Sequence, residues 1–586
     1  MDLPQVHALN CLKFLFTDDR VSQAVAPFIG EALALAVSCF GSDIWAIRNC
    51  GVMLFTALTN RLFGTKRSRN EYLFTASTFT TKSFFEKYPS VRGVLLANLT
   101  EKVRDLESGG TAAVEMVYPA LSLIARLDAA PEYDGMEEFR ALITECMRSC
   151  IWKVREVAAR AYATLVGAKE CLDVIEKLLD IGAEKRNALH GNLCAVRALM
   201  ERRLMQAVVE DRGNGEGTKT PISIQSLVLT NLAIWKRLFE IFAARFDVLV
   251  VENSSSINVG IMLQLITLNL PRLYTDRALC PQLIQNISTY IPTASAVFSH
   301  ITHSSFIGKT FLKEYLISFT LTHFLSLPVP THELESLLLS PDDETARFAR
   351  SALANLSSPT ISKETYTTLL NQATDDQVYH LLRTATLNLL SSLTPAHPDT
   401  AHFEAVITLL EYPPNDQIPV AALPLAGAFL PELQIERFMA VLEPCADEEA
   451  DYEQREAALK STSLAAQNIP MEKESAVPLL LILYQLLTDD DPDIRSETTG
   501  LVCSSRVLGL PHTLLPDAAA EALLKHLRTL FPKSRALWDG LVRILKGKEA
   551  RVGAGKEGVL FEVEKVNLWR DEVVVCEQVA GAAMGR

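Results

Sequence analysis

The stretch SDIWAIRNCGVMLFTALTNRLFGTKRSR, residues 42–69, decides the fold. Its apolar residues recur at steps of three and four from Ile44 to Leu62, which places them on one face of an α-helix. Ser42 or Asp43 is suited to cap the start of this helix, and Gly64 is suited to end it. The pattern predicts one long helix, buried between other helices and followed by a basic segment.

The same helical period continues on both sides of this stretch. It is legible at 5–16, 21–40, 91–106, 112–127 and 137–150, and as short helices between turns over 336–545. The motif Trp45-Ala-Ile-Arg48 returns as Trp152-Lys-Val-Arg155, with weaker echoes at 343–347 and 491–495. An arginine near the start of a helix is typical of HEAT-type repeats, in which each helix pair covers the apolar face of the next. We therefore predict an all-α, armadillo/HEAT-like α-solenoid with irregular repeats.

Composition limits the class of protein. The chain has 586 residues, more than one hydrophobic core holds, and its net charge of −14 argues against coating of nucleic acid by the whole chain. The charge is uneven, because residues 1–100 carry ten Lys/Arg against seven Asp/Glu and residues 441–500 carry four against fourteen. The eleven cysteines never form CxxC, which favours reduced thiols in a cytosolic or nuclear protein, and of these two locations we expect the cytoplasm. The apolar run 476–487 is too short to cross a membrane, so we expect no membrane insertion.

A polar segment divides the chain. Residues 210–221, EDRGNGEGTKTP, contain three glycines and end in proline, a composition typical of a linker. We expect a helical region at 1–205, a linker or mobile loop at 206–222 and a helical-repeat region at 223–586.

No catalytic constellation is legible. The segment 552–558, VGAGKEG, lacks the glycine and the Ser/Thr that a phosphate-binding loop requires, and no strand precedes it. The sequence holds no HExxH, no GxSxG and no His/Cys cluster at metal-ligand spacing. We predict a protein that is not an enzyme, with no metal and no cofactor of its own.

A group of basic residues is the candidate binding site for nucleic acid. Their ammonium and guanidinium groups suit phosphates, and Tyr72, Phe74 and Phe79 nearby have rings on which bases stack. The alternative is a solvated loop beside core aromatics. The candidate RNA contacts are Arg61, Lys66, Arg67, Arg69, Lys82 and Lys87.

Several motifs resemble the THADA family, most strongly over residues 1–205. They are QVHALN at 5–10, IWAIRNCGVMLFTALTNRLFG at 44–64, FFEKYPS at 84–90, NALHGNL at 187–193 and LFEVEKVNLWRDE at 560–572. The resemblance implies a non-catalytic solenoid that positions tRNA for an FtsJ-like tRNA 2′-O-methyltransferase. That partner carries the S-adenosylmethionine site and methylates a ribose in the anticodon loop. The family-signature residues, which we expect to be structural, are Trp45, Arg48, Asn49, His190 and Gly191.

Two further expectations follow from the resemblance. Family members are longer and carry an Arg-Arg-Ser-Ala-Gly stretch upstream of the QVHALN-like helix, so we expect this chain to correspond to the C-terminal portion of such a protein. The alternative function is a solenoid protein–protein adaptor without an RNA role, which a helical scaffold serves equally well.

Overall fold

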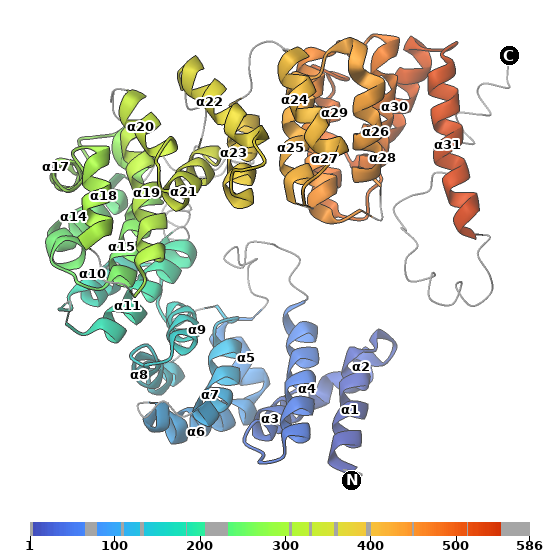
Figure 1. Cartoon of the computed structure of the whole chain (residues 1–586). Helices are drawn as coiled ribbons and strands as arrows, with labels where there is room; N and C mark the ends of the chain where they lie inside the picture. The colour runs from blue at the N-terminus through green and yellow to red at the C-terminus, as the bar shows by residue number, and fades with distance from the viewer. Residues whose placement is uncertain are drawn as a thin grey trace, which may run out of the picture. The chain divides into compact units, whose positions relative to one another are not determined.

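The computed structural model divides the chain into two units, which we describe separately. Unit 1 is Met1–Ser326 and unit 2 is Leu327–Arg586 (Figure 1). The linker predicted at 206–222 falls outside the described residues, so the domain boundaries drawn from it stay a prediction. The structure describes residues 4–64, 79–106, 111–128, 130, 134–182, 184–204, 232–303, 307–326, 331–356, 361–393, 400–415, 417–447, 450–511 and 514–552.

Unit 1 is built from helices throughout its described residues, which confirms the predicted all-α class. An isolated parallel β-bridge between Thr80 and Asp128 is the extended pairing recorded within these residues. The elements are α1 (Pro4–Thr17), η1 (Asp19–Val21), α2 (Ser22–Val25), η2 (Ala26–Phe28), α3 (Ile29–Cys39), α4 (Trp45–Phe63), α5 (Thr81–Lys87), α6 (Pro89–Leu106), α7 (Thr111–Ile124), η3 (Asp134–Met136), α8 (Glu137–Cys146), α9 (Trp152–Ala163), α10 (Cys171–Leu179), α11 (Arg186–Leu199), η4 (Met200–Leu204), α14 (Leu232–Phe246), η5 (Asp247–Val251), α15 (Ser256–Thr267), α16 (Leu270–Thr275), α17 (Pro281–Tyr290), α18 (Ala294–His303) and α19 (Lys309–Leu325).

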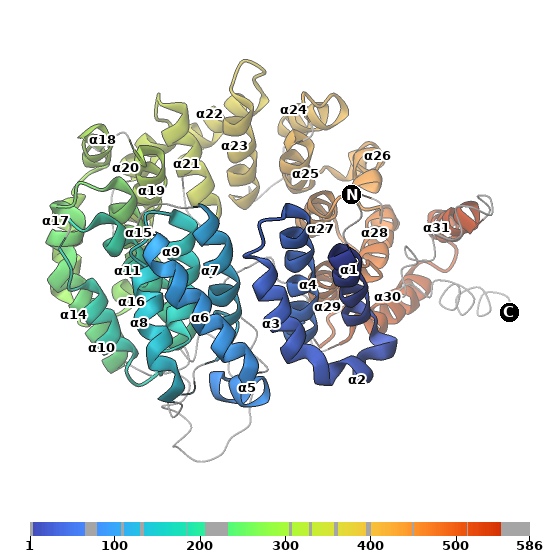
Figure 2. The ribbon, with the colours of Figure 1, turned by 90° about the horizontal axis from the view of Figure 1, so that it is seen from below.

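The helices of unit 1 stack in two layers. In one layer α7, α9, α11, α15 and α19 pack in that order, and in the other α3, α6 and α8 follow one another. The pairs α6–α7, α8–α9 and α10–α11 join the layers, and Figure 2 shows α6, α7, α8 and α9 side by side. Each pair buries the apolar face of its neighbour, as the repeat pattern predicts.

Unit 2 repeats this arrangement more regularly. The helices α21, α23, α25 and α27 form one layer, and α22, α24 and α26 form the other. Its elements are α20 (Thr331–Leu338), α21 (Asp343–Ala354), α22 (Lys363–Thr374), α23 (His380–Ser392), α24 (Thr400–Glu411), α25 (Gln417–Phe429), η6 (Glu432–Gln434), α26 (Ile435–Cys445), α27 (Tyr452–Asn468), η7 (Glu474–Ala476), α28 (Val477–Leu487), α29 (Pro492–Cys503), α30 (Pro516–Leu530) and α31 (Arg535–Val552).

Helix α4 ends where the sequence predicts and begins later. Gly64 follows its last residue with a φ of +76°, a left-handed conformation that favours glycine. Its N-cap is Ile44 in an extended conformation without a side-chain cap, so capping by Ser42 or Asp43 was wrong. The Ser42 hydroxyl instead accepts the Ile44 N–H at 3.2 Å. Ser42 and Asp43, which were expected to cap α4, therefore lie in the turn that precedes this helix.

One helical stretch among the described residues, Ser22–Cys39, has the length and hydropathy of a membrane span, and 33% of it is buried. It is not one continuous α-helix, because Pro27 lies in the 3₁₀ turn η2 between α2 and α3. Helix α3 packs against α4 and α6, which is the environment of a core helix in a repeat fold.

Candidate nucleic-acid interface

The C-terminal ends of α4, α7, α9 and α11 lie together along one edge of unit 1. The Thr164 hydroxyl after α9 donates to the Ile124 carbonyl at the end of α7, at 3.2 Å. The Arg126 guanidinium after α7 lies 5.8 Å from the centre of the Phe63 ring at the end of α4. We call this surface the arginine edge and define it by Arg61, Arg126, Arg160, Arg197 and Arg202.

Two of these arginines fasten helix ends to one another. Arg202, in the π-helical turn η4, donates to the carbonyls of Ala125 and Leu127 at 2.8 and 2.6 Å and pairs with Asp128 at 3.0 Å. Arg61 donates to the Phe16 carbonyl at the end of α1, at 2.6 Å. The last carbonyls of a helix lack intrahelical donors and carry the negative end of its dipole, so arginines gather there.

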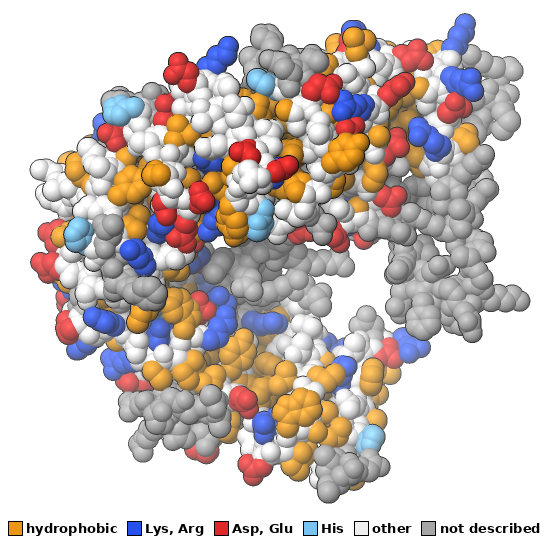
Figure 3. Space-filling model, viewed as in Figure 1, with side chains coloured by type: hydrophobic (Ala, Val, Ile, Leu, Met, Phe, Trp, Pro, Cys, Tyr) orange, Lys and Arg blue, Asp and Glu red, His pale blue; other side chains and the backbone are white. Residues whose placement is uncertain are grey.

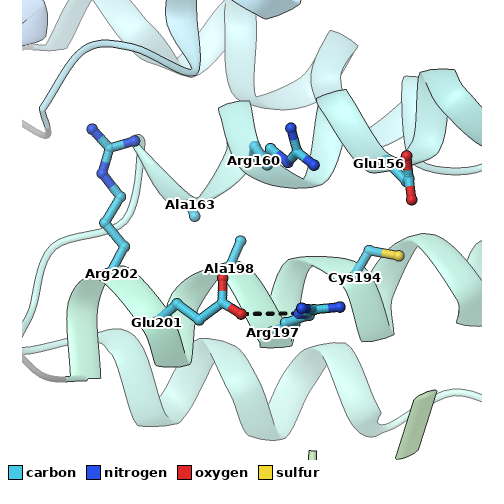
Figure 4. A pocket seen from close by; sticks show the side chains of 8 residues that line it. All are labelled: Glu156, Arg160, Ala163, Cys194, Arg197, Ala198, Glu201 and Arg202. Carbon is cyan, nitrogen blue, oxygen red and sulfur yellow. Dashed lines mark hydrogen bonds and ion pairs between the residues drawn. The ribbon is translucent and has the colours of Figure 1, made fainter. Parts of the chain in front are cut away.

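A small pocket opens between α9 and α11 on this edge. In Figure 4, the pocket lies between Arg160 and Glu156 of α9 on one side and, on the other, Cys194 and Arg197 of α11 and Glu201 of η4. Arg197 pairs with Glu201 at 2.9 Å. The cavity volume is about 50 Å³, room for water and not for a nucleotide.

Two titratable groups of the pocket, Cys194 and Glu156, have pKa values shifted away from those of a nucleophile or a general acid. Burial raises the pKa of the Cys194 thiol to about 12, so this thiol stays protonated and is not a nucleophile. Burial also raises the pKa of Glu156, but hydrogen bonds from Trp152 and Lys153 and the nearby cations outweigh it and hold that pKa below its usual value. Within the described ranges, no group of three His, Cys, Asp or Glu side chains is placed to hold a metal ion.

Arg126 differs from its neighbours on the edge. Its guanidinium lies against the Phe63 ring, and no hydrogen bond or ion pair to it is found among the described residues. Half-burial lowers its pKa from the usual value, although an arginine remains charged at neutral pH. Arg126 therefore presents open N–H donors beside a ring that orients them.

The predicted RNA contacts separate into three groups. Lys82 is exposed in the first turn of α5, next to Thr81, whose N–H donates to the Asp128 carbonyl at 2.8 Å. Lys87 is exposed and lies over the rings of Phe79 and Tyr88, at 5.3 and 5.5 Å. Arg61 is held by carbonyls of the α1 end, as described above. Lys66, Arg67 and Arg69 lie outside the described residues.

Among the aromatic residues proposed to stack bases, Phe79 is the one that the structure describes, and it packs against other rings of the protein. The Phe79 ring contacts the rings of Phe63, Phe84 and Tyr88 at 6.2, 5.9 and 6.4 Å. The half-buried Phe79 ring therefore packs edge-to-face with other aromatic rings of the protein. Tyr72 and Phe74 lie outside the described residues.

Arg48 and Arg155, the arginines of the repeated motif, make matching contacts. In each, Nη1 donates at 2.7 Å to the carbonyl of a serine six residues earlier, Ser42 or Ser149. Arg48 also pairs with Glu115 of α7 at 3.3 Å. These contacts tie the turn before each helix to the helix itself.

Arg495 makes the same link to the Asp489 carbonyl at 2.6 Å, so the echo at 491–495 keeps the register. The echo at 343–347 does not, because Ala346 lies at the equivalent position. The buried arginine of α21 is Arg350, which donates to the Leu338 carbonyl at 2.9 Å. Arg347 therefore lies one position later in its helix than Arg48, Arg155 and Arg495 do in theirs, and counting it as a copy of the motif was wrong.

The signature residues His190 and Gly191 lie beside the second copy of the motif, at residues 152–155, where His190 contacts Arg155 and Trp152. Arg155 donates from Nε to Nδ1 of His190 at 3.0 Å, and the Trp152 ring lies 4.3 Å from the imidazole. A Cβ on Gly191 would meet the Met147 carbonyl oxygen at 1.9 Å, so only glycine lets α11 approach the end of α8 this closely. In the first copy, Trp45 is 69% exposed and Asn49 is exposed.

Sequence reasoning missed Arg126, Arg160, Arg197 and Arg202 as members of one surface. In Figure 3, Lys and Arg side chains gather where α5, α7 and α9 lie in Figure 1. The available signal was a basic residue in or just after the last turn of successive predicted helices, which the sequence shows at 61, 126, 160 and 197.

Comparisons with known proteins match the first third of the chain. Residues 48–199 match the family model described as Trm732, C-terminal TPR repeats, and residues 1–46 match THADA/TRM732, DUF2428. The tRNA (32-2′-O)-methyltransferase regulator trm732 of Schizosaccharomyces pombe is 37% identical over 207 residues, 34% of this chain and 14% of that protein. The regulator THADA of Homo sapiens is 32% identical over 213 residues, 34% of this chain and 11% of that protein.

A crystal structure of importin beta aligns with 92% of this chain and 70% of its own, at 13% identity and a TM-score of 0.37. The sequence matches are more specific than this structural match, and they cover α4, α7, α9 and α11, the helices of the arginine edge. Residues 1–199, about a third of this chain, therefore resemble the C-terminal part of the THADA/Trm732 family.

Proposed function

We propose that this chain is a non-catalytic regulatory subunit for ribose 2′-O-methylation at nucleotide 32 of tRNA. It positions the anticodon loop for a partner FtsJ-like methyltransferase that carries the S-adenosylmethionine site. The observation that carries this proposal is the match of residues 1–199 to proteins named as regulators of that methylation. The chain spans a small part of those relatives, so the activity of the whole protein belongs to the proposal.

The structure supports a positioning role. Stacked helix pairs present extended surfaces, and Arg126 on the arginine edge offers a guanidinium with the geometry that phosphates accept. We place the complex in the cytoplasm, in keeping with the free thiols of the described cysteines.

The test is mass spectrometry of ribose methylation in tRNA from cells that lack the gene for this chain, with and without its re-expression. We expect loss of 2′-O-methylation at nucleotide 32 and recovery when the 586-residue chain is supplied. Other methylated riboses of the same tRNAs serve as internal controls. Unchanged methylation at nucleotide 32 would overturn the proposal and favour the protein–protein adaptor.

A further inference from the structure

We propose that Arg126 is the centre of an RNA-binding site on the arginine edge and that it contacts backbone phosphates of folded RNA rather than bases. This inference rests on the proposed function and assigns it a surface. It is carried by the state of the Arg126 guanidinium and by the charges and rings around it.

The first step is the open donor capacity of Arg126. A guanidinium has five N–H donors in a rigid fork that matches phosphate oxygens in pairs. The cation–π contact with Phe63, 5.8 Å from the guanidinium carbon to the ring centre, restricts the orientations of this fork, so less conformational entropy is lost when an anion binds. Arg202 shows the contrasting case, because its donors are taken by Ala125, Leu127 and Asp128.

The second step is the surroundings of Arg126. Three segments meet at Asp128: the end of α7, the turn η4 through Arg202, and residues 79–81 through their backbone hydrogen bonds. These contacts bring the exposed Lys82 to the same neighbourhood as Arg126 and Arg202. The acid there, Asp128, is already paired with Arg202 at 3.0 Å. The site therefore offers positive charge in excess.

The third step concerns the mode of recognition. The Phe63 ring is covered by Arg126 and by the Phe84 ring, which stacks on it at 6.3 Å with an interplanar angle of 26°. The Phe79 ring is likewise engaged by its neighbours. In this part of the described edge, both rings already contact protein side chains, Lys87 lying over Phe79 at 5.3 Å, which disfavours stacking of a base. Contacts to phosphates then dominate, and these do not depend on sequence.

The experiment measures fluorescence anisotropy of a labelled tRNA transcript with the full-length chain, titrated at several salt concentrations without any methyltransferase. Arg126→Gln should weaken binding roughly tenfold, since a hydrogen-bonded charge pair is lost. It should also reduce the slope of log K against log salt by roughly 0.7 to 0.9, the value for one phosphate contact. Arg126→Lys should keep the slope and lose part of the affinity, because an ammonium lacks the fork.

The matched control is Arg347→Gln. Arg347 of unit 2 also lies over a ring, that of Phe348, at 4.3 Å, and it is half-buried like Arg126. This variant should bind the transcript as the wild type does. Circular dichroism melts of all variants confirm that the fold is kept.

Two results would overturn the assignment of the site to Arg126 and RNA: unchanged affinity and salt slope in Arg126→Gln, or binding of poly-glutamate without binding of RNA. Tighter binding of single-stranded RNA than of an RNA duplex of unrelated sequence would overturn the backbone mode. The methylation assay is independent of these titrations. If RNA binding depends on Arg126 but methylation is unchanged in cells that lack the gene, the proposed function is wrong and the binding site stands. If the chain restores methylation but RNA binding does not depend on Arg126, the proposed function stands and the binding site is wrong.

Discussion

At the scale of single residues, His190 shows how burial sets the charge of a side chain. It is 2% exposed, and its Nδ1 accepts a hydrogen bond from Arg155. Burial and the neighbouring Arg155 charge lower its pKa to about 4. The imidazole is therefore neutral in the folded protein and acts as an acceptor, which a protonated histidine could not do.

A pH dependence of stability follows from this shift. Because the folded-state pKa of His190 lies below its ordinary 6.5, the unfolded chain binds a proton first as the pH falls. The stabilisation is complete above pH 6.5 and is lost toward pH 4. Between pH 7.5 and pH 5 we expect a loss of about 2 kcal/mol in the free energy of unfolding from this residue.

The comparison is urea unfolding of wild type and His190→Asn at both pH values. Asparagine keeps an acceptor for Arg155 but does not titrate, so its loss between the two pH values should be smaller by that amount. His323, whose burial also lowers its pKa to about 4, is present in both proteins and cancels in the difference. Equal losses in the two proteins would contradict the prediction.

At the scale of elements, the helical period of the apolar residues and the helix-ending glycine at position 64 were sufficient to predict much of the fold. The apolar stripe of α4 and its stop at Gly64 are local properties, so the sequence alone indicates them. The start of α4 was misplaced because Ser42 bonds within the preceding turn and does not cap the helix. The sequence shows arginines near several helix ends, but it does not show that Arg126 and Arg202 lie together, because stacking of α7, α9 and α11 brings them to one edge.

The contact between α8 and α11 gives an element-scale prediction. Gly191→Ala would place a Cβ 1.9 Å from the Met147 carbonyl oxygen, so the two helices must separate. We expect a loss of about 3 kcal/mol in the free energy of unfolding, the upper range for overpacking. Gly93→Ala is the control, because its Cβ has nothing within 4 Å and alanine favours the helix α6. That variant should be stabilised by about 0.5–1 kcal/mol in the same urea titrations. Equal midpoints for the two variants would show that α11 adjusts without cost.

At the scale of the whole molecule, charge is divided between the two units. Unit 1 holds 34 Lys/Arg against 32 Asp/Glu, a net charge of +2, and unit 2 holds 22 against 38, a net charge of −16. Part of the acidity of unit 2 is structural, since Arg455 pairs with the buried Asp489 at 2.6 Å. Most of the remainder repels a polyanion, so an overall charge of −14 coexists with one unit suited to RNA.

This division predicts where RNA attaches. Photo-cross-linking of a tRNA transcript that carries 4-thiouridine to the full-length chain, followed by peptide mapping, should yield cross-linked peptides from Met1–Ser326. Peptides around the α5 start and the α7 end should dominate, because Lys82 and Arg126 lie there. Raising the salt concentration should reduce all of these cross-links together, since each phosphate contact releases counterions. Cross-links confined to Leu327–Arg586 would contradict the prediction, because the RNA would then bind the acidic unit through contacts other than phosphate–arginine pairs.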